Sequence, residues 1–151
     1  MDSDKPIKPE DVIGHAALME GVLDSALVRL LHMKRAEPDE MFGLVAAYNT
    51  GQRLELLRSL LSREKGRDHE ADDAGVRAAR EVFKARNDFA HWMVGRWDES
   101  EQKFTGVKRH RGKPSNIEYT FEEVANLCGQ SMRVSIWLGS IVHAYPSPYP
   151  D

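Results

Sequence analysis

Apolar residues recur at helical spacing along most of the chain. The first predicted helix runs from about residue 10 to residue 34, with Pro9 before it and Glu10 and Asp11 near its positive end. Its apolar stripe consists of Val12, Met19, Leu23, Ala26, Leu27, Leu30 and Leu31. A second helical region starts near Pro38 and ends before a break at residues 49–51. Its apolar and aromatic positions are Met41, Phe42, Leu44, Val45 and Tyr48.

Two further helices are predicted on either side of a polar loop. Thr50 is expected to cap the first of them, whose apolar positions are Leu54, Leu57, Leu60 and Leu61. Residues 66–73 are polar and acidic, which predicts a loop. The next helix is expected to run unbroken from about residue 72 to residue 97. Its stripe contains Val76, Ala79, Phe83, Ala90, Val94 and Trp97.

The helical pattern stops over residues 98–116, which are polar and rich in turn-forming residues. Segments 103–107 and 117–119 can pair as a short β-hairpin around a basic tip. Thr120 then predicts the start of a last helix, because Glu123 stands at the position that completes a capping box. The apolar positions of this helix are Val124, Leu127, Met132, Ile136, Leu138, Ile141 and Val142. The proline-rich tail after it is expected to be extended.

These elements predict an all-α fold, a bundle of four or five helices with at most a short β-hairpin before the last one. The chain has 151 residues, of which 41% are hydrophobic and 30% charged, so we expect one domain over residues 1–151. Residues 1–8 and 145–151 are expected to be flexible tails. No stretch has the run of uncharged apolar residues that a membrane span requires, and the start does not resemble an export signal.

The single cysteine and the net charge exclude further classes of protein. Cys128 cannot form an internal disulfide or a thiolate metal cluster, and we expect a cytoplasmic location. The net charge of −3 argues against coating nucleic acid through overall charge, but a local basic site is compatible with it. Phosphate-binding glycine loops, hydrolase serine elbows and zinc-binding His-Glu-x-x-His helices are absent from the sequence. The acidic segment 68–73 is interpreted as a solvated loop rather than a metal site.

A polar group interrupts the apolar stripe of the predicted helix over residues 72–97. In the sequence Arg-Asn-Asp-Phe-Ala-His at residues 86–91, Asn87 falls within the stripe, and Arg86 and His91 flank it on opposite sides. Asn87 and His91 are four residues apart and can share a face of the helix. An unpaired buried guanidinium or amide costs several kcal/mol. These side chains therefore need either hydrogen-bond partners or a hydrated cleft.

The same six residues resemble the Arg-x(4–6)-His signature of the HEPN superfamily. Trp92 and Trp97 follow, then a hairpin-like insert and a capped helix, in an order similar to small bacterial HEPN-like proteins. The Arg-Asn-x-Phe-Ala-His stretch is also similar to that of the mannitol-repressor-like group. The likeness is specific over residues 86–97 and looser over 117–142.

This resemblance implies a metal-independent endoribonuclease that needs no cofactor and acts as a homodimer with its motif helices facing each other. His91 would be the general base or acid, since histidine titrates near neutral pH. Arg86 would hold the scissile phosphate, and Asn87 would orient His91 or contact the phosphate. The expected products carry 2′,3′-cyclic phosphate ends. Such an enzyme could be a toxin or defence effector that an antitoxin or another regulatory protein restrains.

A basic stretch could guide the RNA backbone to this site, although such stretches are more often solvated loops. Its residues are Lys108, Arg109, Arg111 and Lys113.

Two interpretations without catalysis stay open. Arg86, Asn87 and His91 could form a satisfied polar network with Asp88 or with a carboxylate from another helix. The protein would then be a HEPN-like regulator that binds a protein or DNA, or a helical interaction module. No exposed helix suited to reading DNA is evident, so protein binding is the stronger alternative.

Overall fold

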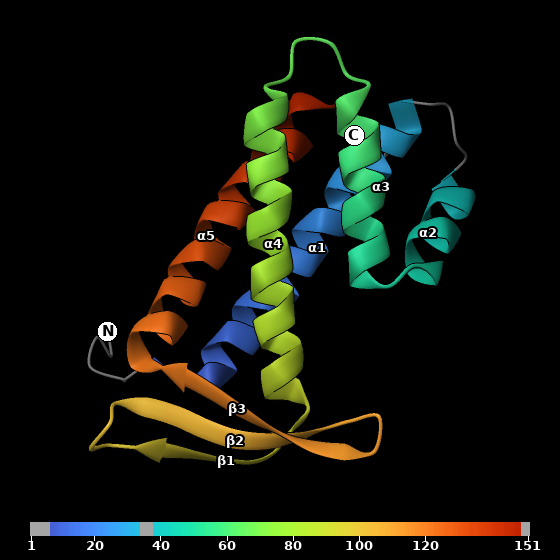
Figure 1. Cartoon of the computed structure of the whole chain (residues 1–151). Helices are drawn as coiled ribbons and strands as arrows, with labels where there is room; N and C mark the ends of the chain where they lie inside the picture. The colour runs from blue at the N-terminus through green and yellow to red at the C-terminus, as the bar shows by residue number, and fades with distance from the viewer. Residues whose placement is uncertain (1–6, 34–37, 149–151) are drawn as a thin grey trace.

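The computed structural model describes residues 7–33 and 38–148 as a helical bundle that stands on a small antiparallel sheet (Figure 1). The helices in these ranges are α1 (Pro9–Met33), α2 (Pro38–Ala47), α3 (Thr50–Ser62), α4 (His69–Ala90) and α5 (Phe121–Ala144). None of them carries an apolar stretch long enough to cross a bilayer. Residues 1–6 and 149–151 of the two expected tails lie outside the described residues.

The prediction of an all-α fold is wrong, because the chain after α4 forms a sheet of three strands. These are β1 (Trp92–Asp98), β2 (Lys103–His110) and β3 (Lys113–Thr120), paired in that order. The expected hairpin is the β2–β3 pair, with Phe104 opposite Tyr119, and it is longer than predicted. The sheet lies across the end of the bundle where α4 ends and α5 begins (Figure 1).

The helix predicted to reach residue 97 ends at Ala90, and the residues after it form β1. An aromatic or β-branched residue recurs at Trp92, Val94 and Trp97, and such residues favour strands more than helices. Gly95 within the same segment disfavours a helix. A segment this short fits either periodicity, and pairing with β2 decides between them.

Side-chain caps fix the starts of three helices. Thr120 and Glu123 form the predicted capping box of α5, at 3.1 and 2.7 Å. At α3 the cap is Asn49 rather than Thr50, because the Asn49 side chain accepts from the Gln52 N–H at 2.9 Å. Helix α4 starts inside the predicted loop over residues 66–73, where Asp68 accepts from the backbone N–H of residue 71 at 3.1 Å.

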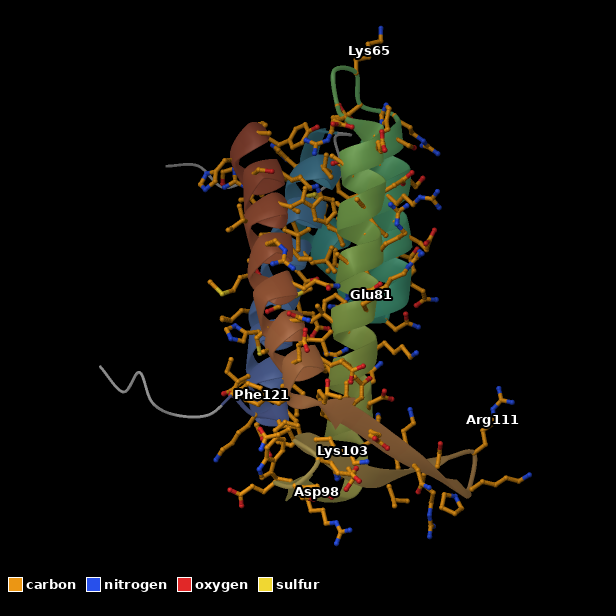
Figure 2. All side chains as sticks on the ribbon, turned by 60° about the vertical axis from the view of Figure 1, so that its left-hand side comes forward. Lys65, Glu81, Asp98, Lys103, Arg111 and Phe121 are labelled. Atoms are coloured by element: carbon orange, nitrogen blue, oxygen red, sulfur yellow. The ribbon has the colours of Figure 1, made fainter. Side chains whose placement is uncertain are left out.

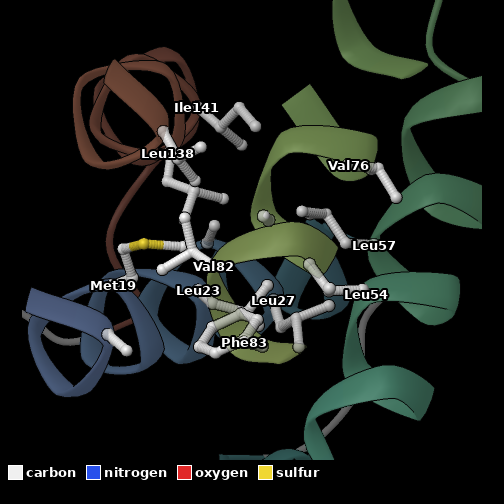
Figure 3. Close-up of a cluster of buried hydrophobic side chains, with 14 of the residues drawn as sticks. Met19, Leu23, Leu27, Leu54, Leu57, Val76, Val82, Phe83, Leu138 and Ile141 are labelled. Carbon is white, nitrogen blue, oxygen red and sulfur yellow. The ribbon is translucent and has the colours of Figure 1, made fainter. Parts of the chain in front are cut away.

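The core lies between α1, α3, α4 and α5 (Figure 3). The predicted stripe of α1 is confirmed, since all seven of its apolar residues are buried. Met19, Leu23 and Leu27 of this stripe meet side chains from the other three helices, namely Leu54, Leu57, Val76, Val82, Phe83, Leu138 and Ile141. Two apolar positions predicted for the last helix, Met132 and Ile136, are exposed because they lie on the side of α5 away from this core.

Two facing glycines make room for the indole of Trp92 on the sheet. Gly95 of β1 pairs with Gly106 of β2, and a Cβ atom at either position would overlap the Trp92 ring. The Gly106→Ala variant is therefore expected to lower the free energy of unfolding by about 1–3 kcal/mol, measured by urea denaturation. As a control, Gly21→Ala adds a methyl group in open space on α1 and should stabilise the protein slightly. Equal stability of the two variants would contradict this packing.

Candidate functional site

The motif at residues 86–91 lies at the C-terminal end of α4, beside the sheet. Ala90 is the last residue of the helix, and His91 is its C-cap, whose backbone N–H donates to the Asn87 carbonyl at 3.1 Å. Asn87 and His91 are both exposed to solvent. Two of the three predicted catalytic residues are therefore open to solvent within one turn of the helix end.

Arg86 points instead toward α1 and α3. Its Nη1 donates to Glu20 Oε2 at 3.0 Å, its Nη2 to Thr50 Oγ1 at 3.3 Å and its Nε to Asn87 Oδ1 at 3.0 Å. The guanidinium also lies over the Phe83 ring, 5.2 Å from its centroid. The Arg86 side chain is 21% exposed, so it is half-buried rather than free.

A second guanidinium shares the same carboxylate. Arg53 Nη1 lies 3.2 Å from both Glu20 Oε1 and Asp24 Oδ1, and the Thr50 hydroxyl donates to Glu20 Oε1 at 3.1 Å. Burial, with the nearby Glu20 charge, raises the pKa of Asp24 despite the opposing effect of Arg53. The cluster thus holds two cations against two carboxylates and joins α1, α3 and α4.

The N–H groups of Arg86 that have no partner among the described residues determine whether it can bind a phosphate. A guanidinium has five N–H groups, and three of those on Arg86 are used by Glu20, Thr50 and Asn87. Two remain for an anion such as a phosphate. Arg86 can therefore contact a phosphate only while it also faces Glu20, which opposes the approach of an anion.

Asp88 belongs to a separate network on the sheet side of α4. It is buried, and its two carboxylate oxygens accept from Lys108 Nζ of β2 and from the Tyr119 hydroxyl of β3, the latter at 2.7 Å. Desolvation, together with the neighbouring carboxylate, raises the pKa of Tyr119.

The predicted alternative of a polar network therefore has a structural basis in part. Arg86 and Asn87 are bonded to each other, and Arg86 is also bonded to Glu20 of α1. Asp88 bonds instead to the sheet, and the His91 side chain bonds to none of the residues of these two networks.

The four basic residues predicted to bind RNA do not share one environment. Lys108 is half-buried and paired with Asp88, whereas Arg109, Arg111 and Lys113 are exposed. Arg111 projects from the tip of the β2–β3 hairpin (Figure 2), where it and Gly112 have φ angles of 49° and 79°. Three exposed cations therefore lie on the hairpin end.

Strand register relates these cations to His91. Trp92, the residue after His91, is paired with Lys108, so residues 109–113 extend beyond the start of β1. His91 stands at that same start. The exposed histidine and the basic tip are consequently at the same end of the sheet, which the sequence spacing alone did not show.

The described residues contain no cluster of three or more histidine, cysteine, aspartate or glutamate side chains that could hold a metal ion. In the acidic segment, Asp68 caps α4, and Asp72 accepts hydrogen bonds from Arg67 and from the Trp137 indole. Comparison of the chain with protein-family models, curated proteins and solved structures gave no match.

Proposed function

We propose that the protein is a metal-independent endoribonuclease that acts as a homodimer through the motif at residues 86–91. The observation that supports this most is that exposed His91 lies at the same end of the sheet as the basic hairpin tip, residues 109–113. A strand of RNA held by these cations would pass close to an imidazole that can exchange protons with a 2′-hydroxyl. The Asn87 side chain accepts from Arg86 one turn before His91, and the two remaining N–H groups of Arg86 would be available to the phosphate.

The test is cleavage of total cellular RNA in EDTA. The His91→Ala variant is expected to cleave at least about 100-fold more slowly, because it lacks the general acid and base. His143→Ala is the matched control, since His143 is also exposed and lies in the last turn of α5. Product ends should be 2′,3′-cyclic phosphates. Equal cleavage by both variants would contradict the proposal and indicate a contaminating nuclease.

Arg86 needs a gentler substitution, because its guanidinium also joins α4 to α1 and α3. Arg86→Lys keeps the positive charge beside Glu20 but loses the planar fork that suits a phosphate. We expect this variant to remain folded by circular dichroism and to cleave at least about tenfold more slowly. Light scattering should give the mass of a dimer for the wild type.

The second candidate function is a protein-binding module without catalysis. It is favoured by one observation, that Glu20, Thr50 and Asn87 already accept hydrogen bonds from Arg86. This function predicts no cleavage by the purified wild type at any practical concentration. It also predicts a protein partner whose binding survives His91→Ala.

A further inference from the structure

A pocket with a volume of about 720 Å³ opens where the start of α1 meets the sheet and the start of α5. This volume is within the range of small-molecule sites. Phe121 marks the pocket in Figure 2, at the lower end of α5 above the sheet. Five aromatic rings from α4, β1, β2 and α5 line it, namely those of Phe89, Trp92, Trp97, Phe104 and Phe121.

The outer rings of the pocket are left open to solvent. Trp97 is 39% exposed and Phe121 is 36% exposed, and their ring centroids are 6.2 Å apart. Trp97 also contacts Phe104, with a centroid distance of 4.6 Å. The rings of Trp97 and Phe121 meet edge to face, with 68° between their planes, so a flat ring can stack on the exposed part of one of them. Such stacking contributes about 1–3 kcal/mol per stacked base in nucleic-acid complexes. The ring faces therefore favour a planar aromatic ligand.

The charged residues of the pocket favour an anion. Lys8 and Arg96 line it, both are exposed, and neither has a carboxylate partner among the described residues. Glu10 is the one carboxylate among the lining residues that the structure describes, so these residues carry a net charge of +1. An arginine beside aromatic rings suits a carboxylate or phosphate attached to a stacked ring.

We propose that this pocket binds a small molecule that combines a planar aromatic ring with an anionic group. A nucleotide and an aromatic carboxylate share this chemistry. The ring stacks on the exposed part of Trp97, beside Phe121, and the anionic group lies near the lining cations Lys8 and Arg96. The proposal does not rest on the ribonuclease, because none of its three proposed catalytic residues, Arg86, Asn87 and His91, lines the pocket.

The test uses the indole N–H signals of the full chain in two-dimensional ¹H–¹⁵N spectra. The chain has three tryptophans, and Trp137 is an internal control because it lies outside the pocket and donates to Asp72 at 3.1 Å. Titration with 5′-AMP and with indole-3-acetate should shift the signals of Trp92 and Trp97 but not that of Trp137. A Trp137→Phe variant assigns the control signal. Binding of one compound alone identifies the source of the ligand and still supports the site.

Removing one cation from the pocket distinguishes the contribution of the ligand's anionic group to binding from that of its ring. Arg96→Gln is expected to weaken binding of the anionic ligand about tenfold and to leave binding of uncharged indole unchanged. Arg77→Gln, at an exposed cation of α4 outside the pocket, is the control and should change neither. Absence of shifts with both anions at millimolar concentration would overturn the proposal. So would octanoate binding as tightly as either ring compound, or an Arg96→Gln variant that binds the anions normally.

Discussion

Replacing Asp72 by alanine is expected to lower the free energy of unfolding by about 4 kcal/mol, because it breaks a buried charge pair. Asp72 is 5% exposed and lies in the first turn of α4. It accepts from Arg67 Nε and Nη2 at 2.7 and 2.6 Å and from Trp137 Nε1 at 3.1 Å. The alanine variant leaves the half-buried guanidinium and the indole N–H without this acceptor, and it removes a negative charge from the positive end of α4.

Urea denaturation at neutral pH measures this loss, and Asp73→Ala is the matched control. Asp73 is the next residue of the same turn, but its partner Arg58 is 52% exposed and the pair contributes little. We expect the Asp73 variant to lose no more than about 0.5 kcal/mol. If the two variants were equally stable, the contacts of Asp72 would not hold α4 to α5.

Asp72 also makes the free energy of unfolding depend on pH, with its stabilising contribution lost in acid. Burial raises the pKa of Asp72, but the hydrogen bonds from Arg67 and Trp137 outweigh it, so the pKa lies below its ordinary value of 3.8. A carboxyl group with a lowered pKa stabilises the folded state fully above its unfolded pKa and loses that contribution as the pH falls through the folded pKa. The stability difference between wild type and Asp72→Asn should therefore shrink below about pH 4. A difference that stayed constant down to pH 2 would contradict this.

The sequence predicted the elements that local signals define. The stripe of α1 and the capping box at Thr120 and Glu123 depend on residues a few positions apart, and both are confirmed. The sequence predicts helix where β1 forms, because the apolar residues of this segment fit two periodicities and only pairing with β2 selects one. The sequence predicts a loop at the start of α4 because the first turn is acidic and lacks an apolar stripe, although acidic residues suit that end of a helix.

For the candidate site too, the sequence predicts what depends on neighbouring residues and does not predict contacts between distant ones. Its position late in the helical region could be predicted, because the motif at residues 86–91 is contiguous. The pairing of Arg86 with Glu20 joins residues 66 positions apart, and no local pattern indicates it. The pocket was missed for the same reason, since its rings come from segments that only the folded chain brings together.

Replacing Asp88 by alanine is expected to lower the free energy of unfolding by about 3 kcal/mol. Its side chain is 11% exposed and engages both neighbouring strands, through Lys108 Nζ of β2 and the Tyr119 hydroxyl of β3. The alanine variant leaves an ammonium group and a hydroxyl facing an apolar gap beside Phe89, whose ring is 4.8 Å from that of Tyr119. The expected loss is smaller than for Asp72 because Lys108, at 28% exposed, can turn toward solvent.

Two single substitutions, one at each partner of Asp88, measure how much each contact contributes to the free energy of unfolding. Tyr119→Phe removes one hydrogen bond and should cost about 1 kcal/mol, and Lys108→Met leaves Asp88 without its cation and should cost more. In a double-mutant cycle, Asp88→Ala combined with Lys108→Met should be markedly less destabilising than the sum of the single variants. Additive losses would mean that the Asp88–Lys108 pair does not contribute to holding β2 to α4. Because Lys108 is paired with Trp92, the residue after His91, loosening the Asp88 contact should also shift the NMR signal of His91, whereas the Asp73 control should leave that signal in place.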